Sequence, residues 1–176
     1  MPTTLDIKEP GLNVLPPGVE RHTVNMGGLT GLQIFPDDQI EIINEEGDQI
    51  CEIICFDKNG KSELGILSLK ENIKKSFIKE ILNNNDESSL ITKLQLKKRN
   101  LNINNSKSSI IFDKDTPSGE KVKLKSKDKC YVIFSAPKNE MLISDQNPSG
   151  DLTIFIKRAK ITKDKELSII PDPVFE

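Results

Sequence analysis

The stretch that decides the fold is FPDDQIEIINEEGDQICEIICF, residues 35–56. Apolar and polar side chains alternate over residues 39–44, which is typical of a strand with one buried face. Residues 50–56 are apolar on both faces apart from Glu52, which is typical of a strand in the middle of a sheet. Gly47 lies between the two segments and tolerates the positive φ of a tight turn. The stretch therefore predicts two strands joined as a β-hairpin.

Glu52 is the most informative charge in the chain. A carboxylate in the middle of a buried strand must be hydrogen-bonded, paired with a cation or placed at the wall of a cavity. Glu52 is therefore either a pocket group or a structural group whose hydrogen bonds are satisfied inside the fold. The same alternatives hold for Gln49, which either faces a pocket or ties strand backbones together.

The composition predicts one globular domain without a nucleic-acid or membrane partner. The chain has 176 residues, of which 35% are hydrophobic and 30% charged, with a formal net charge of −2 and a mean hydropathy of −0.41. This length suits one domain with a sizeable core. A nearly neutral chain has no electrostatic basis for binding nucleic acid or an anionic membrane, and 5% aromatic residues with no Trp offer little for base stacking.

Targeting and metal-binding patterns are absent from the sequence. Residues 1–15 lack a basic segment followed by an apolar stretch, and no apolar run is long enough to span a bilayer, so we expect a cytoplasmic protein. Cys51 and Cys55 lie about 13 Å apart along one predicted strand, beyond the reach of a disulfide. Together with Cys130 they are expected to be small core side chains. The single His22 and the absence of paired-cysteine spacing predict no metal site.

Outward from the central stretch, residues 68–84 predict the only helix. Ser68 and Glu71 match a capping box, and apolar residues recur at helical spacing up to an Asn-rich stop. Residues 86–98 suit either a short helix, because two serines lie near their start, or a strand, because apolar side chains alternate. We favour the strand.

Many short segments with strand character follow each other at regular spacing. Further strands are predicted near residues 20–25, 32–35, 101–103, 109–112, 121–125, 131–135 and 152–158. This pattern predicts a mainly β fold, an antiparallel sandwich or barrel that carries one amphipathic α-helix. Because both ends are rich in Pro, we expect an extended arm over residues 1–19, a single β-rich domain over 20–168 and the start of a linker over 169–176.

No catalytic residues are predicted from the sequence. The single His, placed in an early strand, does not support a Ser/His/Asp or Cys/His set, and no acid pair has the spacing of a general acid and base. The glycine-rich residues 27–31 lead into a strand and lack the Lys-Ser/Thr of a phosphate loop. Asp37 and Asp38 precede a strand and are expected in a turn.

Two short segments resemble a known family. Residues 39–56 resemble the urea-carboxylase-associated family, a β-rich domain whose sequences run from a strand through G-x-Q-x-x-D into a second strand. Gly47 and Gln49 match this pattern, and Glu52 stands where the family has Asp. Residues 110–119, IIFDKDTPSG, resemble the E-D-T-S-P-G segment in copies of this domain that precede glycine cleavage T-protein-like aminomethyltransferases.

The chain also departs from this family. In those copies a His-Asp pair follows the second segment and a Cys comes later, whereas this chain has Lys121 and Val122 at the pair and Cys130 out of register. The family's short H-x-x-T-R-like segment is missing as well. If these groups form the family's polar site, the resemblance implies that this copy has lost it. The candidate pocket residues that remain are Gln49, Glu52, Asp115 and Thr116.

The resemblance implies two alternative functions. We favour a non-catalytic accessory domain at the N-terminus of a larger, T-protein-like aminomethyltransferase of one-carbon metabolism. Its partners would be other domains of the same polypeptide or a second copy in a homo-oligomer. This chain would bind no cofactor, and tetrahydrofolate is expected only in the downstream transferase. The alternative is a stand-alone small-molecule hydrolase or deiminase with Glu52 as acid/base, or a ligand-binding β-barrel.

Overall fold

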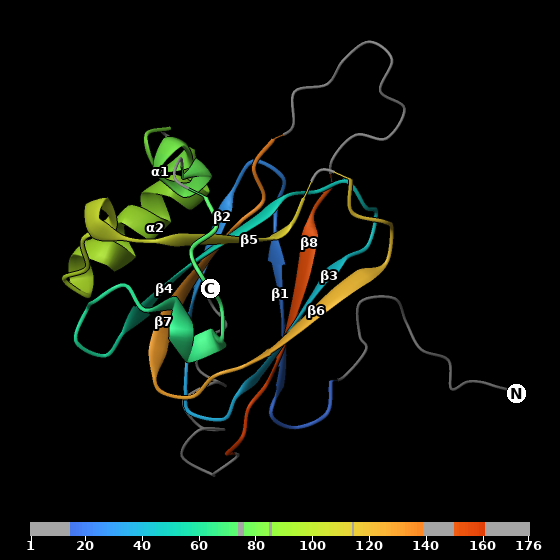
Figure 1. The fold of residues 1–176 in the computed structure, drawn as a ribbon, viewed down its shortest axis with the longest axis horizontal. Coiled ribbons are helices and arrows are strands. Elements are labelled where there is room, and N and C mark those ends of the chain that lie inside the picture. Colours follow the sequence, from blue (N-terminus) through green and yellow to red (C-terminus); the bar gives the residue numbers. More distant parts are fainter. Residues whose placement is uncertain (1–14, 74–75, 85, 114, 139–149, 161–176) are drawn as a thin grey trace, which may run out of the picture.

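The computed structural model describes residues 15–73, 76–84, 86–113, 115–138 and 150–160 (Figure 1). The described residues form eight strands, two short 3₁₀ turns and two helices. The strands are β1 (Val19–Val24), β2 (Leu29–Ile34), β3 (Gln39–Asn44), β4 (Cys51–Asp57), β5 (Ser108–Phe112), β6 (Glu120–Lys125), β7 (Cys130–Ser135) and β8 (Leu152–Lys157). The helices are α1 (Phe77–Leu82) and α2 (Glu87–Lys98), and the 3₁₀ turns are η1 (Leu64–Leu67) and η2 (Ile103–Asn105).

The strands form two antiparallel sheets packed face to face. One sheet has the order β1-β8-β3-β6 and the other the order β2-β7-β4-β5. Successive strands alternate between the two sheets except for β4 and β5, which is the arrangement of a jelly roll. The prediction of a mainly β antiparallel sandwich is confirmed.

The predicted hairpin between β3 and β4 is wrong, because the two strands lie in different sheets. β3 pairs with β6 and β8, whereas β4 pairs with β5 and β7. Both strands turn one face into the same core between the sheets. An alternating pattern reports that buried face and does not distinguish a partner beside the strand from a partner stacked across the core. The central position predicted for β4 is confirmed, since it lies between β7 and β5 and six of its seven residues are buried.

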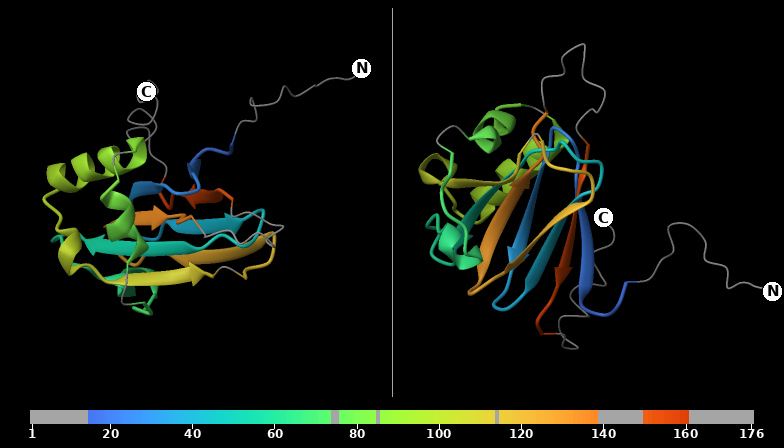
Figure 2. Two further views of the ribbon diagram at one scale, coloured as in Figure 1. Left: turned by 90° about the horizontal axis from the view of Figure 1, so that it is seen from above. Right: turned by 45° about the vertical axis from the view of Figure 1, so that its right-hand side comes forward.

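Apolar side chains fill the space between the sheets. This first cluster includes Ile34, Ile42, Ile53, Phe134 and Ile154, each 0% exposed. A second cluster lies on the outer face of the β2-β7-β4-β5 sheet, where side chains of α1 and α2 pack against it. Figure 2 shows the two helices on that side of the sandwich. The domain therefore has three layers: helices, sheet and sheet.

The helix predicted over residues 68–84 is much shorter in the structure. Ser68 has a φ of +60° and ends η1, so the expected capping box does not start a helix. The helix α1 starts instead after Ser76, whose side chain accepts a hydrogen bond from the backbone N–H of Lys79. Since Lys79 stands where a capping box has Glu or Gln, the sequence pattern at Ser76 was weaker than the one at Ser68.

Residues 86–98 form α2, so the predicted strand is wrong. Asp86 caps the helix by accepting a hydrogen bond from the Ser89 N–H. Of the alternating apolar side chains, Leu96 is buried, but Leu90 and Leu94 are 47% and 66% exposed. Helical spacing therefore decides which side chains face the sheet. The strand predicted near residues 101–103 is also wrong, because residues 103–105 form the turn η2.

The predicted arm and linker lie mostly or wholly outside the described residues. Residues 1–14 and 161–176 are not among them. β1 starts at Val19 and β8 ends at Lys157, and these two residues are paired neighbours in one sheet.

Candidate functional site

The two segments that resemble the urea-carboxylase-associated family meet at one end of the sandwich. The backbone N–H of Asp48 donates to the Thr116 carbonyl at 2.8 Å, and the Gly119 N–H donates to the Asn44 carbonyl at 2.8 Å. The Ser118 hydroxyl donates to the Glu45 carbonyl at 2.6 Å. The β3–β4 connection and the β5–β6 connection are therefore joined by hydrogen bonds.

Gln49 lies inside this joint and is fully buried. Its Nε2 donates to the carbonyls of Ile50 at 2.8 Å and Pro137 at 2.9 Å, while Nδ2 of Asn44 donates to the Gln49 carbonyl at 2.8 Å. Facing carbonyls assign both amide nitrogens, so the remaining atoms are oxygens. Gln49 Oε1 and Asn44 Oδ1 accept no hydrogen bond within the described part of the chain. These two buried acceptors suit an N–H or O–H donor, such as a buried water molecule.

Asp115 and Thr116 belong to the loop that covers this joint. Thr116 is 7% exposed, and its hydroxyl exchanges hydrogen bonds with Asp113, accepting from the N–H at 3.0 Å and donating to Oδ1 at 3.3 Å. Asp115 is exposed, and its N–H also donates to Asp113 Oδ1. Asp113 therefore shapes the loop. Sequence analysis missed it, although an Asp that precedes a Thr by three residues is typical of such turns.

Glu52 lies on the other face of β4, beneath α1. Its Oε2 accepts a hydrogen bond from the Ser76 hydroxyl at 2.6 Å, and its Oε1 accepts one from the Ile78 N–H at 2.8 Å. All three groups are buried. Glu52 therefore joins the central strand to the first turn of α1. The four candidate pocket residues do not gather in one place: Gln49 and Thr116 lie together, Asp115 is exposed and Glu52 faces the helices, so their role as pocket residues stays a prediction.

The cysteines line the core, as expected. Cys51, Cys55 and Cys130 are free thiols and all are buried. Burial raises the pKa of the Cys51 thiol, and the adjacent Glu52 adds to this effect. Such a thiol stays protonated and unreactive at neutral pH. Among the described residues, no group of three or more His, Cys, Asp or Glu side chains is arranged to hold a metal ion.

A buried ion cluster that the sequence did not reveal fastens the end of β8. Arg158 binds Glu20 through two hydrogen bonds, from Nε at 2.8 Å and Nη2 at 2.9 Å. Its Nη1 donates to Asp38 Oδ2 at 2.7 Å, and Asp38 is 0% exposed. His22 lies within 3.0 Å of the same Glu20 carboxylate. Asp38 was expected simply in a turn, because a partner 120 residues away leaves no local pattern.

This cluster predicts a loss of stability in acid. Burial alone would raise the pKa of Glu20, but the hydrogen bonds from His22 and Arg158 outweigh it and lower this pKa from 4.5 to about 2. Ionised Glu20 therefore stabilises the fold above pH 4.5, and the contribution falls as the pH drops toward 2. Since the site is partly solvated, we expect it to be worth about 1–2 kcal/mol. Urea unfolding of wild type and Glu20→Gln should differ at pH 6 and converge near pH 2; a constant difference would contradict this.

Glycine substitutions test the joint between the two connections. Gly47 has a φ of +81°, and a Cβ there would lie 2.8 Å from the Ser118 nitrogen and 3.0 Å from the Thr116 carbonyl oxygen. Gly119 has nearly the same φ, +82°, with nothing within 4 Å of such a Cβ. Gly119→Ala should cost about 1 kcal/mol of unfolding free energy through the backbone alone. Gly47→Ala should cost about 1–2 kcal/mol more, because backbone atoms must move apart. Equal losses would mean that the joint is loose.

These contacts define a jelly-roll domain whose buried polar side chains hold its loops and helices together. No protein-family model matches the chain. The chain is similar to a trimethylamine-oxide aldolase from Ruegeria pomeroyi, with 32% identity over 168 residues, which is 96% of this chain. It spans 21% of the length of that relative. Within the described residues, no helix has the length and apolar character needed to cross a membrane.

Proposed function

We propose that this chain is a non-catalytic accessory domain, N-terminal in a larger one-carbon enzyme that resembles the T-protein-like aminomethyltransferases. The observation that carries this proposal is that nearly the whole chain, 96%, aligns with about a fifth of a much longer enzyme. The name of that relative describes an aldolase acting on trimethylamine oxide. The two segments resembling the urea-carboxylase-associated domain support the same placement, since such domains precede aminomethyltransferases.

The chemistry of the buried polar groups supports a non-catalytic role. Both carboxylate oxygens of Glu52 accept hydrogen bonds from groups under α1, so this residue lacks the open access that a general acid or base needs. The space between the sheets is filled by apolar side chains, which does not favour the ligand-binding barrel. We propose that tetrahydrofolate and the methylated substrate of the parent enzyme bind outside this chain. The three buried thiols suit a cytoplasmic enzyme.

The size of the native polypeptide tests the accessory role. An antibody raised against this domain should detect a band several times larger than 19.7 kDa in a lysate of the source organism. Such a band is expected because the relative is about five times as long as the matched segment. A band at 19.7 kDa would overturn the proposal.

Ligand and metal measurements on the purified chain test the absence of catalysis. We expect the melting temperature to stay the same with folates, ureas and methylated amines, since a ligand that binds the native state raises it. Metal analysis should find no stoichiometric zinc. A rise of several degrees with a urea, or one zinc per chain, would favour the small-molecule hydrolase instead.

A further inference from the structure

The outer face of the β1-β8-β3-β6 sheet carries a concentrated positive charge. Strand pairing places side chains in three rows across all four strands, because paired residues share a face. The rows are Val19-Lys157-Gln39-Lys125, Arg21-Phe155-Glu41-Lys123 and Thr23-Thr153-Ile43-Lys121. These twelve positions, called the basic face below, hold five cations and one anion, whereas the whole chain has a net charge of −2.

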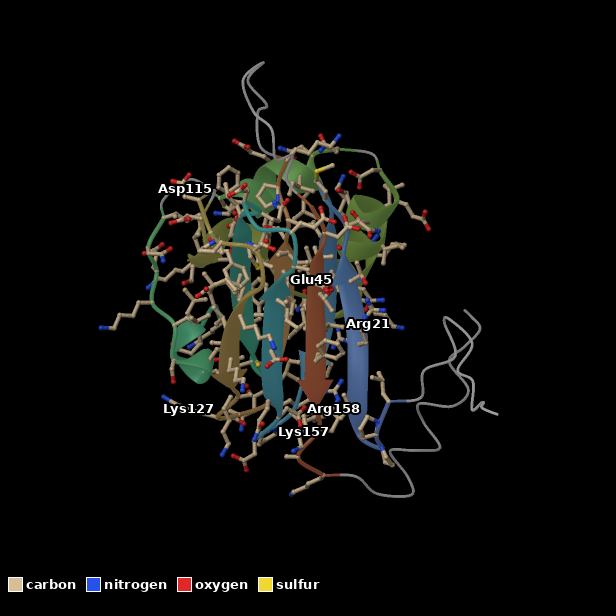
Figure 3. All side chains as sticks on the ribbon, turned by 90° about the vertical axis from the view of Figure 1, so that its right-hand side faces the viewer. Arg21, Glu45, Asp115, Lys127, Lys157 and Arg158 are labelled. Atoms are coloured by element: carbon tan, nitrogen blue, oxygen red, sulfur yellow. The ribbon has the colours of Figure 1, made fainter. Side chains whose placement is uncertain are left out.

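No described segment covers the basic face. The other side of the sandwich is covered by α1 and α2, but Figure 3 shows this sheet from outside with Arg21 and Lys157 toward the viewer. The side chains of Lys123 and Lys125 are 79% and 64% exposed, and their ion pairs with Glu41 and Asp37 are long, at 3.8 and 3.9 Å. Such pairs contribute little and leave both cations available.

A shallow hollow with an apolar centre lies on the basic face. It has a volume of about 580 Å³ and is lined by Val19 and Phe155, with Lys123, Lys125 and Lys157 around them. Half-buried apolar groups within a charged rim are the composition of protein–protein contact surfaces. A single aromatic with Glu41 beside it is poorly suited to a nucleic acid, which needs stacking platforms and repels carboxylates.

The hollow adjoins the places where the chain enters and leaves the domain. Val19 begins β1 and Lys157 ends β8, and these paired residues both line the hollow. A domain joined before residue 15 or after residue 160 is therefore held a few residues from the basic face. Tethering raises the effective concentration of such a domain to the millimolar range for a short linker.

We propose that the basic face docks an acidic surface, with an apolar centre that contacts Phe155, on another domain of the same polypeptide. The inference rests on the proposed accessory role and names the surface that performs it. A second copy using the same face is disfavoured, because a two-fold contact would set lysines against lysines. The contact adds charge-paired positioning to a connection already made by the chain.

Zero-length carbodiimide cross-linking of the native, full-length polypeptide tests the docking. This reagent joins lysine amines to carboxylates that touch them, and mass spectrometry identifies the pairs. We expect cross-links from Lys123, Lys125 and Lys157 to Asp or Glu residues of the same polypeptide outside these 176 residues. Cross-links to the rest of the polypeptide only from α2, at Lys97 and Lys98, or cross-links of the basic face only to a second copy, would overturn it.

Charge reversal supplies the matched control. Lys123→Glu with Lys125→Glu should increase the rate of proteolytic cleavage between this domain and the remainder about tenfold, and the cross-links should disappear. Lys97→Glu with Lys98→Glu, the same change on α2, should leave both unchanged. Equal effects of the two variants, or retention of a labelled DNA 20-mer that only the first variant abolishes, would overturn the inference. A native band at 19.7 kDa removes the accessory role itself, whereas a larger band without these cross-links removes only the docking face.

Discussion

Replacing Arg158 by methionine should lower the free energy of unfolding by about 3–5 kcal/mol. The guanidinium makes two hydrogen bonds to Glu20, one to Asp38 and one to the Gln33 carbonyl at 2.9 Å. Methionine keeps much of the apolar stem but leaves the buried Asp38 carboxylate without its cation, and removing one partner of a buried pair typically costs this much. Urea denaturation at pH 7 measures the loss.

Two further variants make this prediction specific. Arg158→Lys keeps the charge but lacks the planar fork that binds Glu20 through two bonds, so an intermediate loss is expected. Lys157→Met, at the adjacent exposed position, should change the free energy by less than about 0.5 kcal/mol. If Arg158→Met does not fold, the loss in Arg158→Lys still carries the test. A loss for Arg158→Lys no larger than that for Lys157→Met would show that the cluster contributes little.

Replacing Glu52 by leucine should cost about 2–4 kcal/mol. The carboxylate accepts hydrogen bonds from the Ser76 hydroxyl and the Ile78 N–H, and both donors are buried. Leucine fills similar space but leaves both donors without a partner, and an unsatisfied buried polar group costs about 1–3 kcal/mol. The first turn of α1 should also lose order, which native-state hydrogen exchange at Ile78 measures.

A double-mutant cycle separates this contact from general effects of the substitution. Glu52→Leu and Ser76→Ala should show a coupling of about 1 kcal/mol or more, because each removes the other's partner. Glu120→Leu, a change of the same kind at an exposed strand position, should be nearly neutral. A neutral or stabilising Glu52→Leu would mean that Glu52 is held at a cost to stability, which is the behaviour of a functional pocket carboxylate.

The candidate site was predicted as single residues and not as an arrangement. Burial of Gln49 and Glu52 follows from their place in an apolar strand. Their partners do not, because Pro137 lies 88 residues from Gln49 and Ser76 lies 24 residues from Glu52. Nothing local marks Ser76 as a hydrogen-bond donor to a strand.

The sequence by itself determined the class of the fold. Alternating and doubly apolar segments encode which faces of each strand are buried, and burial is a local property that short patterns record. The mainly β architecture, the central position of β4 and the strands β5 to β8 near their observed positions all follow from it. The loop chemistry of Gly47 was also readable, since its positive φ needs a residue without a side chain.

Only the tertiary structure decided how these pieces are joined. The assignment of β3 and β4 to opposite sheets depends on strands more than 60 residues away, so the turn between them carries no record of it. Residues 86–98 became a helix because Thr92 and Leu96 pack on the β2-β7-β4-β5 sheet, which outweighs an alternating pattern of weak propensity. Pairing partners, ion clusters and an uncovered basic face are long-range properties, because they arise from contacts that form after the chain has folded.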